Sequence, residues 1–175
     1  MEDHILESFL TRQHEEAKAL EADSDILEVH AIDGPPAQHY IITLHAKGLV
    51  LDETGNVVEA DRCVMGIRLS DAHLRRIDQG VLTYLGPHAR PWHPNILHQF
   101  VCVHVDPGVS LCELIYTAYE LWTWHLYYTG DEGLNRAASQ WARHQEASRF
   151  PVDRRPLKRR VLPIEVVRAN EESRL

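Results

Sequence analysis

The sequence predicts a single α+β domain in which helices flank an antiparallel meander of strands. Its 175 residues, 44% of them hydrophobic, suit one core that needs neither disulfide bonds nor a structural metal. Strand-like segments follow one another with turn residues between them, whereas a parallel sheet would alternate them with helices. Apolar residues recur at helical spacing near the start of the chain and again in its second half. The expected order is helix, strands, proline-rich loop, helix, helix.

The first part of the chain is expected to hold one helix and three strands. Residues 5–20 carry apolar residues at loosely helical intervals, which predicts an amphipathic helix. Asp33-Gly34-Pro35-Pro36 then breaks the chain. Strands rich in β-branched and aromatic residues or alternating in polarity are predicted at 40–44, 63–69 and 81–85. Turn chemistry at 52–56 should make the first two of these strands pair antiparallel.

The second part is expected to hold an irregular loop and two helices. Pro91 and Pro94 make residues 88–96 mostly irregular, and 100–105 is a short extended run. After a turn at 106–108, the strongest helical pattern in the sequence follows, with a buried face at spacings of three and four (Leu111, Leu114, Ile115, Ala118, Leu121 and Trp122). A second helix is predicted over 134–147.

The packed body is expected to span residues 1–148, followed by a basic C-terminal extension over 149–175. Basic residues crowd the start of this extension, while residues 15–28 are acidic. Such charge runs are usually solvated surface, and the alternative is a docking face for an oppositely charged partner. Residues 162–167 are apolar enough to dock onto the body, as a tail or as an extra strand. The sequence alone decides neither the role of the charge runs nor whether residues 162–167 form a tail or a strand.

The composition indicates which classes of partner and which cellular compartment to expect. A net charge of −8 argues against nucleic acid as a partner, because phosphate-backbone binding needs clustered cations. The N-terminus lacks the pattern of a signal peptide, and no apolar stretch approaches the roughly 20 residues of a membrane helix. Three cysteines at irregular spacings suit a reducing compartment. We therefore expect a cytoplasmic protein without a membrane partner, and we interpret Cys63 and Cys112 as core residues.

One motif points to a function. His93-Pro94-Asn95-Ile96 followed by Val101-Cys102 resembles the active-site signature of ubiquitin-conjugating enzymes. Supporting matches are Gly86-Pro87 before the proline-rich loop, the helix after Asp106-Pro107, and Asn135-Arg136-Ala137 with Trp141 in the closing helix. The resemblance covers roughly residues 5–147. It implies the fold of that family: an N-terminal helix, an antiparallel meander, an active-site loop and C-terminal helices.

The resemblance also implies an activity and partners. Cys102 would accept a ubiquitin-like modifier from an activating enzyme as a thioester and pass it to an amine of a protein substrate, with no cofactor. The short closing helices are similar to those of divergent bacterial members. These occur in operons with a ubiquitin-like protein, an activating enzyme and a deconjugating peptidase, and serve antiphage defence. An antiphage role is thus what the resemblance implies.

The residue types at the motif suit this chemistry. A thioester needs an accessible thiol at Cys102 whose thiolate attacks a carbonyl. An amide donor such as Asn95 can stabilise the resulting oxyanion or brace the loop, and His93 with Pro94 would fix the turn that carries it. A carboxylate should orient the incoming amine, and the candidates are Asp131 first, then Glu132 and Asp106. The other interpretation of each is a helix cap or turn residue.

Several departures keep other interpretations open. Cys102 lies nine residues after His93, one fewer than is usual in the family, and the usual tryptophan after the cysteine is missing. An inactive variant that only binds ubiquitin-like proteins would also show these departures. A zinc site is a second alternative, drawn from a cluster of His88, His93, His98, Cys102 and His104. A cysteine protease, or a buried structural role for Cys102, are further alternatives.

Overall fold

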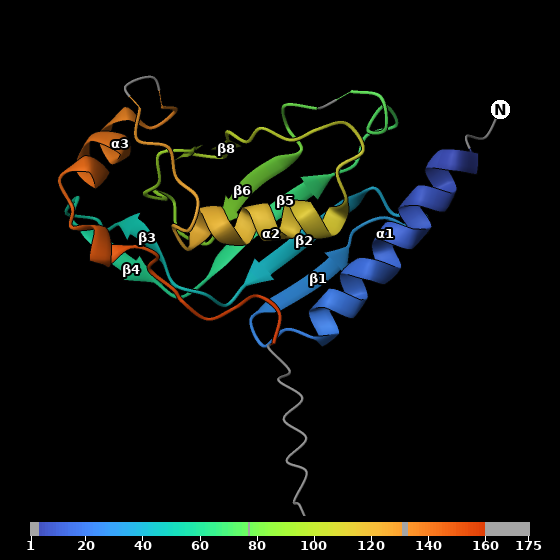
Figure 1. Cartoon of the computed structure of the whole chain (residues 1–175), viewed down its shortest axis with the longest axis horizontal. Coiled ribbons are helices and arrows are strands. Elements are labelled where there is room, and N and C mark those ends of the chain that lie inside the picture. Colours follow the sequence, from blue (N-terminus) through green and yellow to red (C-terminus); the bar gives the residue numbers. More distant parts are fainter. Residues whose placement is uncertain (1–3, 77, 131–132, 160–175) are drawn as a thin grey trace, which may run out of the picture.

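The structure is a computed structural model that describes residues 4–76, 78–130 and 133–159. Helix α1 (His4–Ala22) forms because its apolar side chains lie on one face, and Leu6, Leu10, Ala17 and Leu20 are buried there. α1 lies along one end of a twisted sheet, and α2 (Leu111–Trp122) crosses one face of that sheet (Figure 1). α3 (Arg136–Arg143), β3 (Gly48–Leu51) and β4 (Val57–Ala60) lie at the opposite end (Figure 1). The predicted mixture of helices with an antiparallel sheet is therefore confirmed.

The main sheet has six antiparallel strands. In spatial order they are β1 (Leu27–Ala31), β2 (His39–Leu44), β5 (Cys63–Arg68), β6 (Leu82–Gly86), β8 (Phe100–Val101) and β7 (Ile96–Leu97). β2 pairs with β5 as expected, with Ile42 opposite Met65 and Leu44 opposite Cys63. These four side chains are fully buried, because alternate residues of each strand face the same side.

The turn at residues 52–56 connects a pair of strands other than the predicted one. It joins β3 (Gly48–Leu51) to β4 (Val57–Ala60) in a separate two-stranded sheet that lies within the connection from β2 to β5. Asp52 Oδ1 accepts the Asn56 backbone N–H at 2.8 Å, so the local turn chemistry was recognised correctly. The prediction was wrong about which strands the turn connects, because a turn signal carries no information about long-range pairing.

Two other boundaries differ from the prediction. The extended run expected over 100–105 stops at Val101, and the second helix is α3 (Arg136–Arg143), followed by a short 3₁₀ turn, η1 (Ala147–Arg149). α3 begins at Asn135, whose Oδ1 accepts the Ala138 N–H at 3.1 Å. β1 was not predicted at all. No helix in the described ranges is long and apolar enough to cross a membrane.

Side chains of α1 complete the sheet edge and the start of α2. At β1, the outermost strand, Val29 N–H donates to Glu21 Oε1 at 2.7 Å, and Lys18 Nζ donates to Val29 O at 3.2 Å. Gln13 is buried, and its Oε1 accepts the Leu111 N–H at 2.7 Å. This contact satisfies one of the unpaired donors of the first turn of α2. α1 is therefore bound to both the sheet and the central helix by polar contacts as well as by packing.

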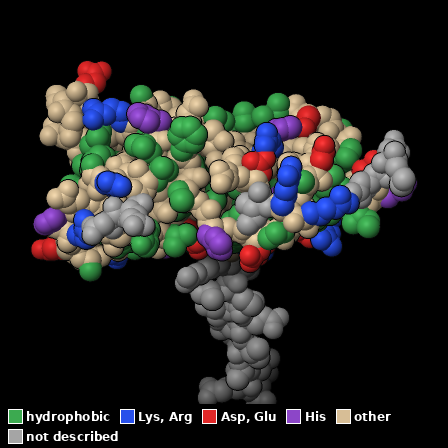
Figure 2. Space-filling model, turned by 90° about the horizontal axis from the view of Figure 1, so that it is seen from above, with side chains coloured by type: hydrophobic (Ala, Val, Ile, Leu, Met, Phe, Trp, Pro, Cys, Tyr) green, Lys and Arg blue, Asp and Glu red, His purple; other side chains and the backbone are tan. Residues whose placement is uncertain are grey.

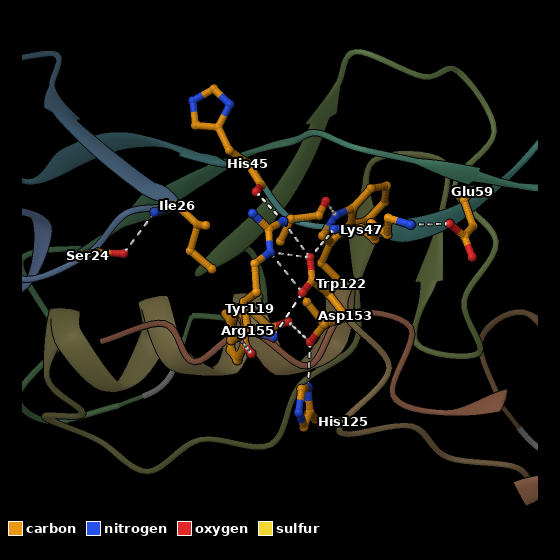
Figure 3. A network of polar contacts seen from close by, with 12 residues as sticks. Ser24, Ile26, His45, Lys47, Glu59, Tyr119, Trp122, His125, Asp153 and Arg155 are labelled. Carbon is orange, nitrogen blue, oxygen red and sulfur yellow. Dashed lines mark hydrogen bonds and ion pairs between the residues drawn. The ribbon is translucent and has the colours of Figure 1, made fainter. Parts of the chain in front are cut away.

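Residues 150–159, called the strap below, run back across the body. Phe150 enters a small hydrophobic cluster at the α3 end, and Leu157 enters the main core. Between them, Asp153 Oδ2 accepts the Lys47 backbone N–H at 2.8 Å and Arg155 Nη2 at 2.7 Å (Figure 3). The described start of the predicted extension is thus packed against the body. The division at residue 148 stays a prediction, and residues 162–167 lie outside the described residues.

The acidic and basic segments noted in the sequence contact each other through the end of the strap. Lys158 Nζ lies 3.1 Å from Asp23 Oδ2, and Arg159 Nε lies 3.3 Å from Asp25 Oδ1. Arg159 Nη2 also donates to the Ala22 carbonyl at 2.7 Å. Exposed ion pairs of this kind contribute little stability. They nevertheless show that part of the basic run has its acidic partner within the same chain.

Candidate functional site

Cys102 follows directly on β8, the second strand from one edge of the main sheet, and its side chain is exposed. A buried structural role for this cysteine is therefore wrong. Cys63 is fully buried, as expected, and burial raises its pKa well above the ordinary value. Cys112 is only partly buried on α2, and burial also raises its pKa. Among these thiols, Cys102 has the access that a nucleophile needs.

His93 holds the turn before Cys102 from inside the protein. Its Nδ1 accepts the Asn95 backbone N–H at 3.0 Å, and its Nε2 contacts the Leu126 carbonyl at 3.1 Å. A carbonyl only accepts and a backbone N–H only donates, so the ring is neutral with its hydrogen on Nε2. Burial lowers the pKa of His93 to about 3, although the bond to Leu126 opposes this shift. The expected structural role of His93 is consistent with these contacts.

Asn95 connects the turn to the cysteine. Its Nδ2 donates to the Cys102 carbonyl at 3.2 Å, and its Oδ1 accepts the Tyr128 backbone N–H at 3.1 Å. In addition, the Cys102 N–H donates to the Asn95 carbonyl at 2.8 Å. Residues seven apart in the sequence are thereby held together by both main-chain and side-chain bonds. The structure brings His93, Asn95 and Cys102 into one continuous hydrogen-bonded unit.

Three further segments support this unit, and sequence reasoning missed their roles. β3 pairs with the residues just before His93, because Leu51 N–H donates to Arg90 O at 2.9 Å and Trp92 N–H donates to Leu49 O at 2.8 Å. The segment after α2 supplies the Leu126 and Tyr128 contacts given above. At the start of α3, the Asn135 N–H donates to Pro94 O at 2.9 Å. Most of these bonds use backbone atoms, so residue identity gave little signal for them.

A second contact of Asn135 strengthens the support from α3. Its Nδ2 donates to Ile96 O at 3.3 Å, while its Oδ1 caps the helix. The side chain is 8% exposed, so all of these bonds are shielded from water. Asn135 was noted in the sequence only as part of the family resemblance. Its pattern, an asparagine before a helical run, predicted the cap but could not predict contacts with a loop 39 residues away.

The acceptor-orienting carboxylate is not located by the structure. Asp131 and Glu132, two of the three candidates, lie outside the described residues. Asp106 lies in the turn before α2, where its carbonyl accepts the Val109 N–H at 3.1 Å, as a turn residue does. Asp131 therefore stays a prediction.

The described residues give no support to the zinc alternative. Both ring nitrogens of His93 are taken by backbone groups, so this ring cannot ligate a metal without breaking the turn. His98 is exposed at the tip of the β7–β8 hairpin, with φ 54°. Within residues 4–76, 78–130 and 133–159, no three histidine, cysteine or acidic side chains are grouped so that they could hold a metal ion.

Exposed apolar side chains occur in the segments that form the site. Figure 2 shows hydrophobic side chains on the face seen from above, more of them toward the end at which α3 lies. Phe100, two residues before Cys102, is 73% exposed, and Leu126, Tyr128 and Leu134 are also exposed. Tyr128 belongs to the segment that binds Asn95, so part of this surface borders the hydrogen-bonded unit directly. Large exposed apolar side chains mark surfaces that other proteins can cover.

Comparison with known proteins finds a similarity only among solved structures. No family model matches the chain, and no curated protein matches it. The chain is similar to a ubiquitin conjugating enzyme E2 from Agrocybe aegerita at 11% sequence identity, with a TM-score of 0.47. That similarity covers 80% of this chain and 94% of the other. At this low identity the similarity concerns the path of the backbone and gives no information about a reaction.

Proposed function

We propose that this chain is a conjugating enzyme that carries a ubiquitin-like modifier as a thioester on Cys102. The observation that carries the proposal is the bonded unit of His93, Asn95 and Cys102, in which an exposed thiol sits on a loop fixed by a neutral, buried imidazole. The motif resemblance supports the same function. The fold adds support because the helix, meander, loop and helices occur in the expected order.

In the first step, the Cys102 thiolate attacks the carbonyl carbon of the modifier's thioester on an activating enzyme. A new carbon–sulfur bond forms, and the thiolate of the activating enzyme leaves. In the second step, an amine of a protein substrate attacks the thioester on Cys102, an amide bond forms, and Cys102 leaves as a thiolate. The amine gives up its proton to water, and Asp131 is our candidate for the carboxylate that orients the amine. No cofactor takes part in either step.

Asn95 has two tasks in this scheme. An asparagine side chain carries two N–H donors, and one of them suffices for the bond to the Cys102 carbonyl. We propose that the second donates to the oxyanion that forms when the amine attacks. Removing a donor of this kind from other enzymes costs roughly 100- to 1,000-fold in rate. The brace and the oxyanion contact come from the same side chain, so a variant of Asn95 should affect both.

The setting of this reaction is also part of the proposal. We infer that the enzyme is cytoplasmic and that it binds its activating enzyme, its modifier and its protein substrate in the cytoplasm. We also infer that neither nucleic acid nor a membrane is a partner. The similarity of the sequence to divergent bacterial members supports a role in antiphage conjugation. The exposed apolar surface around Phe100 and Tyr128 suits protein partners.

The test is formation of a thioester adduct. Incubation with the cognate activating enzyme, modifier and ATP should give an adduct that thiol reagents cleave and that Cys102→Ala cannot form. Cys112→Ala is the matched control, because it removes a less accessible thiol and should leave charging intact. Asn95→Ala should charge but transfer the modifier slowly. A partner set that functions with another conjugating enzyme, yet gives no adduct here, would identify the chain as a binding module instead.

A further inference from the structure

Trp124 has an unusual backbone conformation just after α2. Its φ is 64°, in the left-handed region that a residue with a side chain rarely adopts. The indole ring is 1% exposed, and within the described part of the chain its N–H finds no hydrogen-bond acceptor. Both features cost free energy. Such costs persist only where the surrounding packing holds the residue in place, and they cluster near functional sites.

Aromatic packing holds Trp124. Its ring stacks on Phe150 of the strap, with centroids 4.7 Å apart and planes 8° apart. The same ring meets His93 edge-on, with centroids 4.8 Å apart. The strap is fastened beside it by a bond from Val152 N–H to Thr123 O at 2.8 Å. Trp124 therefore contacts both the strap and the imidazole that supports the cysteine loop.

The conformation of Trp124 also directs the segment that follows it. After this residue the chain turns back, and the N–H groups of His125 and Leu126 both donate to Glu120 O, at 2.8 and 3.0 Å. The next residues then supply the Leu126 carbonyl to His93 and the Tyr128 N–H to Asn95. The left-handed residue therefore lies at the turn that leads from α2 to these two groups.

We propose that Trp124 is a positioning residue for Cys102, acting through His93 and Asn95, and that Phe150 of the strap fixes its ring. The consequence for catalysis rests on the proposed function. The coupling between Trp124 and His93 can be tested separately, because it concerns only the state of the imidazole. By this proposal, the strap contributes to the geometry of the site through Phe150.

The experiment uses the full chain with Trp124→Leu, which keeps an apolar side chain but removes the ring. ¹⁵N spectra of the histidines should show His93 neutral with its hydrogen on Nε2 in the wild-type chain, down to a pH of about 4.5. In Trp124→Leu, His93 should titrate closer to the ordinary value near 6.5. Transfer from charged Cys102 to a free amine should slow by about tenfold to a hundredfold, because misplacement by about 1 Å has that effect. The maximal rate should fall, with little change in the amine concentration that gives half of it.

Trp141→Leu is the matched control. Its ring lies in the same cluster and packs edge-on against Trp124 at a centroid distance of 5.8 Å and against Trp92 and Phe150 at 6.2 Å each. Its loss therefore also removes aromatic packing, but it leaves the Trp124 ring in contact with His93. It should leave the His93 spectrum unchanged and slow transfer less than threefold. Trp124→Phe, which retains a ring, should restore most of the wild-type behaviour. Phe150→Leu removes the stacking partner of the Trp124 ring, should shift His93 and slow transfer in the same direction as Trp124→Leu, and serves if Trp124→Leu does not fold.

The outcomes separate this inference from the proposed function. A Trp124→Leu chain, or in its place Phe150→Leu, overturns the positioning role if its His93 spectrum and transfer rate both match those of Trp141→Leu. A wild-type chain that forms no thioester defeats the proposed function, and the His93 spectra then decide the positioning role alone. In that case, a Trp124→Leu chain in which His93 keeps its wild-type spectrum would overturn the positioning role.

Discussion

Acid should destabilise this protein through His93. Burial lowers the pKa of His93 from 6.5 to about 3, so between these values the unfolded chain binds a proton that the folded chain does not. The stability linked to this residue is therefore complete above pH 6.5 and falls as the pH decreases, by about 1.4 kcal/mol per pH unit. At a pH near 4.5 the loss amounts to about 2.7 kcal/mol. This figure holds for any folded pKa well below 4.5, so it depends only weakly on the size of the shift.

Urea unfolding of the wild-type chain and of His93→Asn, at pH values near 7 and 4.5, measures this effect. Asparagine keeps an acceptor for the Asn95 N–H but loses the donor to Leu126, so the variant should be less stable at neutral pH by roughly 1–3 kcal/mol. It has no imidazole to protonate, so the stability of the wild-type chain relative to the variant should fall by about 2.7 kcal/mol at the lower pH, which nearly cancels or reverses the difference at neutral pH. A difference that stays constant over this range would refute a buried neutral His93.

Three other predictions follow from the structure. Iodoacetamide should label Cys102 well before Cys63, as peptide mass spectrometry would show, and comparable rates would contradict the exposure of Cys102. Gly48→Ala should destabilise the folded protein by roughly 1–3 kcal/mol, because its Cβ would lie 2.3 Å from a buried tryptophan ring. Thermal unfolding measures this effect, and Gly34→Ala is the control because Gly34 has open space around it. Asp153→Asn should lower the free energy of unfolding by about 2.5 kcal/mol at neutral pH. Burial raises the pKa of the Asp153 carboxyl, but hydrogen bonds from Arg155 and Lys47 outweigh burial and lower this pKa to about 2. That contribution should disappear as the pH falls from about 4 to about 2, and an equal cost at both ends would refute the assignment.

Local patterns predicted much of the fold. The apolar spacings of α1 and α2 gave their faces, and Leu111, Leu114 and Ala118 are fully buried as expected. The alternation in β5 predicted a strand there, and its pairing with β2 is confirmed although the turn used to predict it joins β3 to β4. β1 was not predicted although buried Leu27 and Val29 alternate with exposed Glu28 and His30, because an alternation over five residues gives a weak signal. Its position depends on α1, whose side chains bind its edge.

The candidate site was predicted less completely than the fold. The motif brought His93, Asn95 and Cys102 together as a hypothesis, and the structure gives the bonds between them. The supports could not be predicted, because they use main-chain groups from segments that are distant in sequence. A left-handed Trp124 has no local signature, since nothing in the residues around it requires that conformation. Tertiary packing alone decides it.

The strap has a consequence for how the protein matures during synthesis. Chains fold from the N-terminus as they leave the ribosome, and Phe150 and Leu157 fill both hydrophobic clusters only at the end of the described chain. Until these residues emerge, the ring of Trp124 lacks its stacking partner and the cysteine loop lacks its final support. The cysteine loop would therefore reach its final form only after residues 150–157 have been translated.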